Sequence, residues 1–352
     1  MRLDPATLEK AASSEALAVF DGASILVTGA SGLIGSAFAE LLLAARAGGR
    51  DIDIVLAGRN ESALRARFAD APAPWTFEPH DALRPWRGSR SFDFILHAAA
   101  PAHPAALASR PADTIRAIVQ GTADILSHAA ETSARRVLFV SSSEVYGVLP
   151  GKTAPWRENE LGAVPLLSPR SCYPQGKRAA ETLCAATAAQ SGLDIVIARP
   201  GHVYGPTVTA ADSRAHAQFA RAAVLGEPIV LKSDGIQPRS YLHALDGATA
   251  LATLFAKGAP GEAYNLASSE ITTVREMAEA FAAAGNVPLR FDRPTSAESA
   301  GYNPMPMSAL DGSGLSRLGW RAIHTIADGA EDTVVRLSRD GTLSPAAASS
   351  DS

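Results

Sequence analysis

The chain has 352 residues, of which 47% are hydrophobic and 19% charged, and its formal net charge is −4. This composition is typical of a globular protein with one large or two smaller cores, and it lacks the basic excess of a nucleic-acid binder. Cys172 and Cys184 are too few for a disulfide framework, no apolar run reaches the roughly 20 residues of a membrane span, and no signal-peptide pattern is present. We therefore expect a cytoplasmic protein with no membrane partner.

Residues 1–21 are predicted to form a short helical extension. Asp4 is a suitable N-cap, Pro5 suits the first helical position, and Leu8 and Leu17 offer apolar surface for packing. We expect this segment to act as a lid or as a packing extension.

A glycine-rich segment from Thr28 to Gly35 follows a predicted strand at 23–27 and precedes an apolar helix at 36–45. This is the setting in which such a segment binds a dinucleotide: the first glycine allows a tight turn, the second lets the backbone approach the pyrophosphate, and the third allows close packing of helix on strand. The helix N-terminus then stabilises the phosphate charge. The predicted cofactor contacts are Gly29, Ser31, Gly32, Leu33, Ile34 and Gly35.

The next predicted strand, 52–57, is followed by Gly58 and Arg59. An NAD-preferring site usually carries an acid near this point, whereas an arginine can pair with the 2′-phosphate of NADP. The cofactor is therefore NAD or NADP, and Arg59 favours NADP unless it is an ordinary solvated arginine. Asp81, after the presumed third strand, is a candidate partner for the adenine amino group. After a predicted strand at 92–96, three small residues would let the backbone lie against the cofactor: Ala98, Ala99 and Ala100.

A predicted helix at 114–131 and strand at 136–140 lead into a run of serines and an acid, including Ser142, Ser143 and Glu144. Ligands of open parallel sheets bind beyond the carboxyl ends of the strands. We therefore expect all three residues to be catalytic, and Ser143 and Glu144 also to contact substrate. The alternatives are a cap or turn role for the hydroxyls and a solvated loop position for the acid.

Tyr173 and Lys177 follow a proline-rich loop at 148–170. On a helix, positions i and i+4 share one face, so the ammonium can lower the pKa of the phenol from its ordinary value of about 10. The tyrosine then becomes usable as a base near neutral pH. Such a pair alone is weak evidence, because surface helices contain it by chance, but the surrounding motifs favour catalytic and cofactor-binding roles for both residues.

A predicted strand at 194–198 leads to a loop that also falls at the carboxyl edge of the sheet. Pro200 and Val203 are predicted to flank the nicotinamide. His202 is interpreted as a substrate contact or a packing residue rather than an acid or base.

Strand–helix alternation weakens after residue 206, which indicates a smaller C-terminal lobe with helices at 270–284 and 327–337. Arg214, Lys232 and Arg239 are candidate contacts for a nucleoside diphosphate, because arginine binds phosphate in a bidentate manner. The predicted organisation is an extension at 1–21, a dinucleotide-binding domain at 22–200, a mainly substrate-binding lobe at 201–342 with some elements returning to the first domain, and a disordered tail at 343–352.

The glycine-rich segment, Ser142, Tyr173 and Lys177 occur in the order found in the extended short-chain dehydrogenase/reductases, which the chain resembles from about residue 22 to 336. The resemblance also covers the segments 203–206, 239–241 and 264–265. It implies an α/β fold, a Rossmann-type doubly wound parallel sheet with a smaller mixed C-terminal substrate-binding lobe, and a homodimer joined through a four-helix bundle. It also implies that Arg239 contacts the diphosphate of a nucleotide-sugar substrate.

Within that class, the segments 142–147 and 169–178 are most similar to those of UDP-glucuronate decarboxylases, and dTDP-glucose 4,6-dehydratases have a similar segment. Both belong to the nucleotide-sugar branch of the NAD-dependent epimerase/dehydratase family. Two features depart from the pattern: Arg59 replaces the acid of an NAD enzyme, and the segment 302–307 lacks the arginines often found there.

The resemblance implies a shared first step, in which Tyr173 takes the proton of a sugar C4 hydroxyl while hydride passes to the nicotinamide. Lys177 would hold the cofactor ribose, and Ser142 would bond the reacting oxygen. The 4-ketone can then lose CO₂, lose water, or be reduced again with inversion. Glu144 favours chemistry at C5, so decarboxylation or dehydration is expected first, then 4-epimerisation, then net reduction by NADPH. A non-catalytic NADP-sensing protein is the remote alternative.

Overall fold

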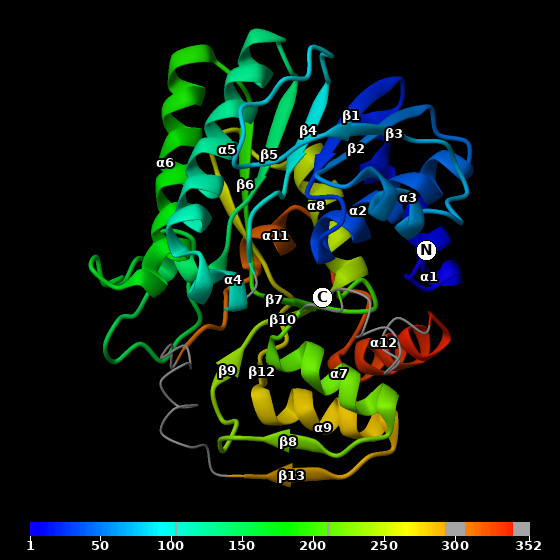
Figure 1. Ribbon diagram of the computed structural model, residues 1–352, viewed down its shortest axis with the longest axis vertical. Helices are drawn as coiled ribbons and strands as arrows, with labels where there is room; N and C mark the ends of the chain where they lie inside the picture. Colours follow the sequence, from blue (N-terminus) through cyan, green and yellow to red (C-terminus); the bar gives the residue numbers. More distant parts are fainter. Residues whose placement is uncertain (103, 210–211, 293–306, 341–352) are drawn as a thin grey trace.

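The computed structural model describes residues 1–102, 104–209, 212–292 and 307–340. The expected tail at 343–352 and all but the last residue of the segment 302–307 lie outside this part of the chain. Figure 1 shows a larger domain built on a parallel sheet and a smaller lobe beyond one end of its strands.

Seven strands form the main sheet, and every neighbouring pair in it is parallel. Across the sheet they lie in the order β11 (Ala263–Leu266), β6 (Ile195–Pro200), β5 (Arg136–Val140), β4 (Phe94–His97), β1 (Ala23–Thr28), β2 (Ile52–Gly58) and β3 (Thr76–Pro79). The strand order reverses between β1 and β4, which is the switch point of a doubly wound sheet. The predicted fold class is therefore confirmed.

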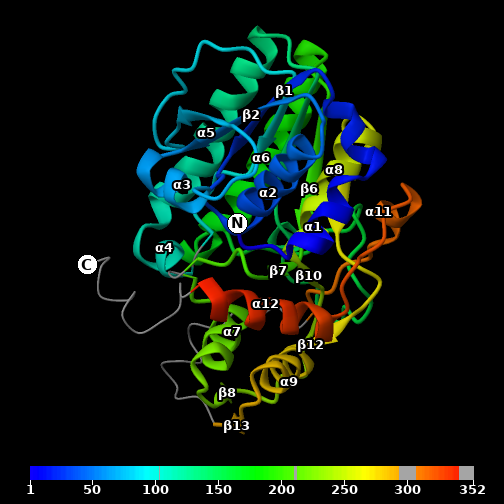
Figure 2. The same ribbon diagram turned by 90° about the vertical axis from the view of Figure 1, so that its right-hand side faces the viewer.

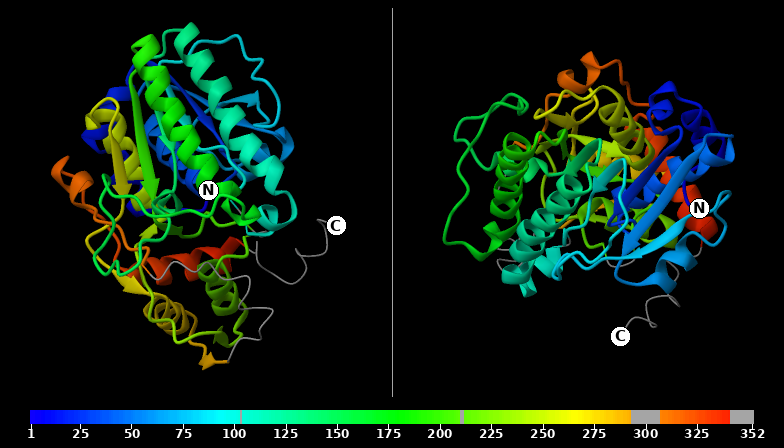
Figure 3. Two further views of the ribbon diagram at one scale, coloured as in Figure 1. Left: turned by 90° about the vertical axis from the view of Figure 1, so that its left-hand side faces the viewer. Right: turned by 90° about the horizontal axis from the view of Figure 1, so that it is seen from above.

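Helices cover both faces of the sheet. The covering helices are α2 (Leu33–Ala47), α3 (Glu61–Arg67), α5 (Pro111–Glu131), α6 (Cys172–Ser191) and α8 (Ala244–Lys257). Helices α5 and α6 lie side by side on one face, and α2 packs against α8 on the other (Figures 1 and 3).

Alternation along the strands explains why two cores form. Ile25 and Val27 of β1 belong to the core on the α2 and α8 side, whereas Leu26 between them belongs to the core beneath α5 and α6. Successive side chains of a strand point to opposite faces, so a strand with helices on both sides is apolar at every position.

The C-terminal lobe lies beyond the carboxyl ends of the strands (Figures 1 and 2). Its elements are β7 (His202–Tyr204), α7 (Ala215–Leu225), β8 (Ile229–Leu231), β9 (Pro238–Arg239), β10 (Tyr241–His243), β12 (Thr272–Thr273), α9 (Val274–Gly285), β13 (Leu289–Phe291) and α12 (Ile326–Asp340). Between these elements, α8 and β11 return to the Rossmann domain, and α11 (Ser313–Arg317) packs against β11. Helix α9 begins at Val274, later than predicted, because Thr273 caps it in a capping box with Glu276.

The N-terminal extension contains α1 (Pro5–Ala12) and a 3₁₀ helix, η1 (Glu15–Phe20), rather than one helix. Asp4 caps α1 as predicted, accepting a hydrogen bond from the Thr7 amide at 2.9 Å. Asp4 is also ion-paired with Arg336 of α12, and the Arg2 guanidinium donates to the Val208 carbonyl at 2.7 Å. The extension therefore contacts both the Rossmann domain and the lobe. No helix in the described part of the chain is long and apolar enough to cross a membrane.

Candidate active site

The glycine-rich turn between β1 and α2 has the shape that a pyrophosphate needs. Gly29 has φ of +69°, and a Cβ there would lie 2.7 Å from the Ala98 carbonyl oxygen, whereas a Cβ on Gly35 would lie 2.3 Å from the Gly29 carbonyl oxygen. Gly32 is the N-cap of α2, and no side chain caps the helix. A Cβ on Gly32 would meet only the Gly29 carbonyl oxygen, at 3.2 Å. The amides of the helix N-terminus thus face open space, which fits a dinucleotide pyrophosphate.

The other predicted cofactor residues lie along the same edge of the sheet. The amides of Ala98 and Ala99 donate to the Thr28 hydroxyl at 3.2 and 3.3 Å, so the small-residue segment that ends at Ala100 is held beside the turn. The Asp81 carboxylate accepts from the Leu83 amide at 3.1 Å. The remaining predicted cofactor contacts differ in exposure. Ser31 and Arg59 are exposed and Ile34 is half-buried, whereas three are buried: Leu33, Pro200 and Val203.

Arg59 makes no hydrogen bond or ion pair with the described residues. It follows β2 directly, and the space beside Gly58 is filled by the Leu64 side chain, which lies 2.8 Å from a Cβ placed on that glycine. The guanidinium is thus available to an anionic group at the end of β2.

Ser142, Tyr173 and Lys177 come together where β5 ends and α6 begins. The Ser142 side chain acts on the Tyr173 phenol and lowers its pKa. The Lys177 ammonium donates to the Val140 carbonyl at 2.7 Å and lies 5.9 Å from the centre of the Tyr173 ring. All three side chains are buried. The fold therefore assembles the predicted trio.

Burial, rather than the lysine, dominates the protonation of the tyrosine. It raises the pKa of Tyr173 to about 12, and the nearby Glu144 carboxylate adds to the rise. The Ser142 side chain and two guanidinium groups, from Arg214 and Arg170, act in the opposite direction. The expected lowering of the pKa by Lys177 is not observed, because that ammonium is turned towards the Val140 carbonyl oxygen. Burial also lowers the pKa of Lys177 to about 8.

Glu144 is held by a residue that sequence reasoning missed. The Arg170 guanidinium donates to its carboxylate at 2.9 Å. Arg170 stands in the segment 169–178. In the sequence, the pairing of Arg170 with Glu144 is indicated only by the general rule that a carboxylate inside a site needs a partner. Ser142 accepts a hydrogen bond from the Glu144 amide at 3.2 Å, so it also has the cap role considered as an alternative, and Ser143 is buried in the 3₁₀ turn that follows.

Four of the predicted substrate residues lie in the lobe, and three of them come close together. The His202 ring packs 5.4 Å from that of Tyr241, and its buried Nδ1 has no hydrogen-bond partner among the described residues. Burial, with the charges of Arg239 and Arg214, lowers the pKa of His202 to about 3, so this imidazole is neutral. Arg214 is held by the buried Asp212, whose carboxylate accepts from its Nε at 2.9 Å.

Arg239 and Lys232 differ in their positions. The Arg239 guanidinium donates to the Pro238 carbonyl at 3.0 Å and contributes to the field at His202. Lys232 is exposed and follows β8, which lies at the end of the lobe remote from the main sheet (Figure 1). The structure therefore groups Arg214, Arg239 and His202 but gives no such support for Lys232.

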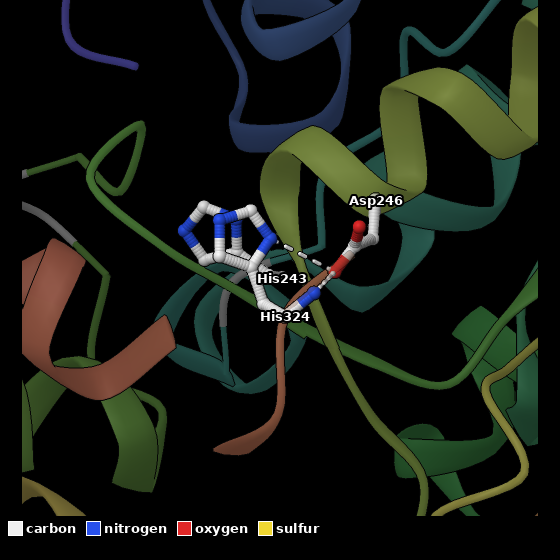
Figure 4. Close-up of side chains that lie close together, drawn as sticks. All are labelled: His243, Asp246 and His324. Carbon is white, nitrogen blue, oxygen red and sulfur yellow. Dashed lines mark hydrogen bonds and ion pairs between the residues drawn. The ribbon is translucent and has the colours of Figure 1, made fainter. Parts of the chain in front are cut away.

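Two histidines and a carboxylate gather at the junction of the lobe and α8 (Figure 4). Within the described ranges this is the one group with the residue types and spacing of a metal site. The Asp246 carboxylate accepts from the His324 Nδ1 at 3.1 Å and from the Ile323 amide at 2.7 Å. The His243 Nδ1 accepts from the Leu245 amide at 3.4 Å. Because these atoms already have partners within the protein, we interpret the cluster as a structural junction.

Comparison with known proteins supports the resemblance to the NAD-dependent epimerase/dehydratase family. Residues 25–267 match the model of the NAD dependent epimerase/dehydratase family. UDP-glucuronic acid decarboxylases 1 and 6 of Arabidopsis thaliana are 33% and 32% identical to this protein, and each match covers 72% of this chain. The matched segment spans 57% of the first relative and 72% of the second.

Solved structures show the same architecture. The dTDP-glucose 4,6-dehydratase DesIV from Streptomyces venezuelae, solved with NAD and TYD bound, is 26% identical, with a TM-score of 0.76 over 90% of this chain and 98% of that chain. UDP-glucuronic acid 4-epimerase from Bacillus cereus is 21% identical, with a TM-score of 0.74 over 90% and 99%, and shows likeness of fold.

The Rossmann sheet, the glycine-rich turn and the serine–tyrosine–lysine trio define an extended short-chain dehydrogenase/reductase, as the sequence predicted. Within that class, the chain belongs to the NAD-dependent epimerase/dehydratase family.

Proposed function

We propose that this protein modifies a nucleoside-diphosphate sugar by oxidising C4 with a tightly bound nicotinamide cofactor and then decarboxylating the 4-keto intermediate. A UDP-glucuronate-like sugar is the preferred substrate. The names of the relatives support this assignment, and the glycine-rich turn fits the cofactor. Dehydration of a sugar with a C6 hydroxyl is the second candidate.

The observation that carries decarboxylation is the Arg170 guanidinium beside Glu144. Its charge is felt at Tyr173, so it lies near the reacting carbon that the phenol would serve. A glucuronate carries a carboxylate on C6, two bonds from C4, and such a group needs a cationic partner in a partly buried site. A neutral C6 hydroxyl has no such need. The arginine thus favours an acidic sugar.

The first half-reaction uses the trio. Bound NAD or NADP would accept the C4 hydride and later return it. Tyr173 takes the C4 hydroxyl proton, Ser142 hydrogen-bonds the same oxygen, and Lys177 holds the cofactor ribose. Because burial disfavours the phenolate, the positive charge that the oxidised cofactor brings to the site would favour deprotonation.

The second half-reaction follows from the chemistry of the ketone. With C6 as a carboxylate, the intermediate is a β-keto acid: the C5–C6 bond breaks, CO₂ leaves, and the electron pair forms an enolate on C4 and C5. The Tyr173 hydroxyl would hydrogen-bond the enolate oxygen, and Glu144 would relay a proton from solvent to C5. When the substrate carboxylate engages Arg170, Glu144 would be released from its ion pair with that guanidinium.

Dehydration would use the same residues in another order. Glu144 would remove the C5 proton as a base and pass it to the C6 hydroxyl, which leaves as water while a C5–C6 double bond forms. The 26% identity and TM-score of 0.76 to the dehydratase from Streptomyces venezuelae favour keeping this candidate. Epimerisation and net reduction would leave Glu144 without a chemical role.

The experiment is mass spectrometry of the purified protein incubated with UDP-glucuronate or dTDP-glucose and either dinucleotide. Loss of CO₂ from UDP-glucuronate is the expected result; loss of water from dTDP-glucose would establish the dehydratase instead. An unchanged mass with altered stereochemistry by NMR would mean an epimerase. Tyr173→Phe is the control, because it should bind cofactor without turnover. If Tyr173→Phe behaves like the wild type, a cofactor-sensing protein is favoured.

The proposal also covers the residues that would bind the diphosphate of the substrate and the assembly of the protein. Arg214 and Arg239 would bind the diphosphate, and the neutral His202 ring, on which both charges act, would contact the substrate beside them. A homodimer joined through a four-helix bundle, which the family resemblance implies, stays a prediction that light scattering in solution would test.

A further inference from the structure

A carboxylate that the proposed mechanism does not use lies one helical turn beyond Lys177. The side chain of Glu181, on α6, is 12% exposed. It accepts from the Ser141 hydroxyl at 2.5 Å and from the Arg199 guanidinium at 2.9 Å (Nε) and 2.6 Å (Nη2). Ser141 directly follows β5 and precedes Ser142, and Arg199 lies in β6.

Arg199 extends this connection away from the helix. Its Nη1 donates to the Tyr146 phenol at 3.1 Å and to the Glu158 carbonyl at 2.7 Å. The Tyr146 hydroxyl donates in turn to the Asn265 side chain at 2.6 Å. Glu181 therefore fastens α6 to the ends of two sheet strands and, through Arg199, to the turn that carries Glu144.

The cost of burying this ion pair requires a reason. Removing a carboxylate and a guanidinium from water is expensive, and an apolar pair of the same volume is often as stabilising. What a fully hydrogen-bonded pair supplies is a single geometry. Here that geometry joins the two segments whose relative position decides whether Ser142, Tyr173 and Lys177 meet the same substrate oxygen and ribose.

We propose that Glu181 is a positioning residue: by bridging Ser141 and Arg199 it holds α6 in register against the end of β5, and its carboxylate lies on the same face of α6 as Lys177, four residues earlier. The hold of Glu181 on α6 depends on its hydrogen bonds, whereas its effect on the Lys177 ammonium depends on its charge. The charge effect has support, because burial lowers the pKa of Lys177 and the Glu181 carboxylate is the leading influence that raises it. Its catalytic consequence rests on the proposed function, whereas its effect on Lys177 does not.

Glu181→Gln tests both parts, since it keeps the shape of the side chain and removes the charge. We expect kcat to fall by about 100-fold, the scale of a misplaced catalytic group, with KM for the sugar changed only a few-fold. Lys177 would also lose its proton at a lower pH than in the wild type. The alkaline limb of the kcat/KM profile, and of the pH dependence of cofactor binding, should therefore move to lower pH.

Two variants separate geometry from charge. Ser141→Ala removes one hydrogen bond to Glu181 but leaves the carboxylate, so it should lower kcat without moving the alkaline limb. Glu61→Gln is the matched control: Glu61 forms an exposed ion pair with Arg65 on α3, and its substitution should change neither readout.

The outcomes are distinguishable. If Glu181→Gln folds with wild-type kcat and an unmoved alkaline limb in cofactor binding, the proposal is wrong. If Glu181→Gln does not fold, Glu181→Asp and Ser141→Ala decide, because a merely structural role would leave their kcat at the wild-type value per folded molecule. If the wild type turns over no nucleotide sugar, the proposed function fails, and the cofactor titration against pH still tests the effect of Glu181 on Lys177.

Discussion

Arg170 and Glu144 illustrate how one contact shapes the chemistry of the site. The pair is half-exposed rather than sealed, so its contribution to folding is small. Its value lies in placing a cation next to the point where C5 and C6 of a sugar would lie. A substrate carboxylate could replace that of Glu144 beside Arg170, which would release Glu144 from its ion pair.

Arg170→Ala should therefore weaken selection for an acidic sugar. Loss of a charged hydrogen bond is worth about 1.5–3 kcal/mol, so kcat/KM for UDP-glucuronate should fall by roughly 10- to 100-fold. Arg170→Lys, which keeps the charge but not the bidentate geometry, should retain part of the activity. Steady-state kinetics with each variant measures the effect. Equal loss on dTDP-glucose and UDP-glucuronate would contradict a role in recognising the carboxylate.

Arg59 is the residue on which cofactor preference depends. If it pairs with a 2′-phosphate, Arg59→Glu should weaken NADP binding by about 10- to 100-fold, because a charge-assisted hydrogen bond is lost, and leave NAD binding nearly unchanged. Titration of each dinucleotide by quenching of protein fluorescence measures both. Tighter binding of NAD than NADP to the wild type would show that Arg59 is an ordinary solvated arginine.

At the scale of elements, local patterns predicted much of the Rossmann domain. The strand at 136–140 has the predicted bounds, and the glycine-rich turn stands between a strand and a helix as expected. Short-range periodicity and glycine spacing contain this information. The pairing of β11 with β6, which places residues 263–266 at the sheet edge, was not predictable, because contacts between Ala263 and Ile197 have no local signal.

The residues of the candidate site likewise divide into those that the sequence predicted and those that it did not. Ser142, Tyr173 and Lys177 were identified because each stands at a fixed place in a motif. The partners Arg170 and Glu181 were not, because the contacts Glu144–Arg170 and Glu181–Arg199 join residues from different elements. A motif gives the reacting groups, whereas the groups that hold them depend on tertiary packing.

The close approach of α2 to the glycine-rich turn gives a sharp prediction. A Cβ on Gly35 would lie 2.3 Å from the Gly29 carbonyl oxygen, a backbone atom that cannot give way cheaply. Gly35→Ala should cost about 1–3 kcal/mol of unfolding free energy and abolish cofactor binding. Gly48→Ala, at the other end of the same helix, is the control, since its Cβ would be 3.4 Å from the nearest atom. Denaturant unfolding and cofactor titration compare the two variants; equal stability and binding would refute the steric argument.

The whole molecule depends on the junction between its two parts, and His324 makes that junction sensitive to pH. The Asp246 carboxylate raises the pKa of His324 above its ordinary value of 6.5 although burial opposes the rise, and Asp332 and Asp328 act in the same direction. The neighbouring His243, 4.1 Å away between ring centres, has a lowered pKa, chiefly through burial, with Asp332 opposing. Of the two neighbouring histidines, His324 is therefore the one that is protonated first as the pH falls.

A raised pKa in the folded state means that His324 stabilises the fold most fully below its unfolded pKa of about 6.5. That contribution is lost as the pH rises through the folded pKa. The unfolding free energy of the wild type relative to His324→Asn should therefore decrease as the pH is raised from about 6. Urea unfolding of both proteins at several pH values measures this difference. His243→Asn serves as the comparison, since the lowered pKa of His243 predicts the opposite trend, and parallel curves for wild type and His324→Asn would refute the assignment.

The position of β11 at the edge of the main sheet has a consequence for synthesis of the chain. Strand β6 is buried along its whole length, but its outer neighbour is made only after the first part of the lobe, from β7 to β10, and helix α8 have been translated. Until then a growing chain presents an apolar strand with unpaired backbone groups, the kind of edge that joins other chains. A chain cut before Ala263 should therefore aggregate even though every motif of the cofactor site is already present.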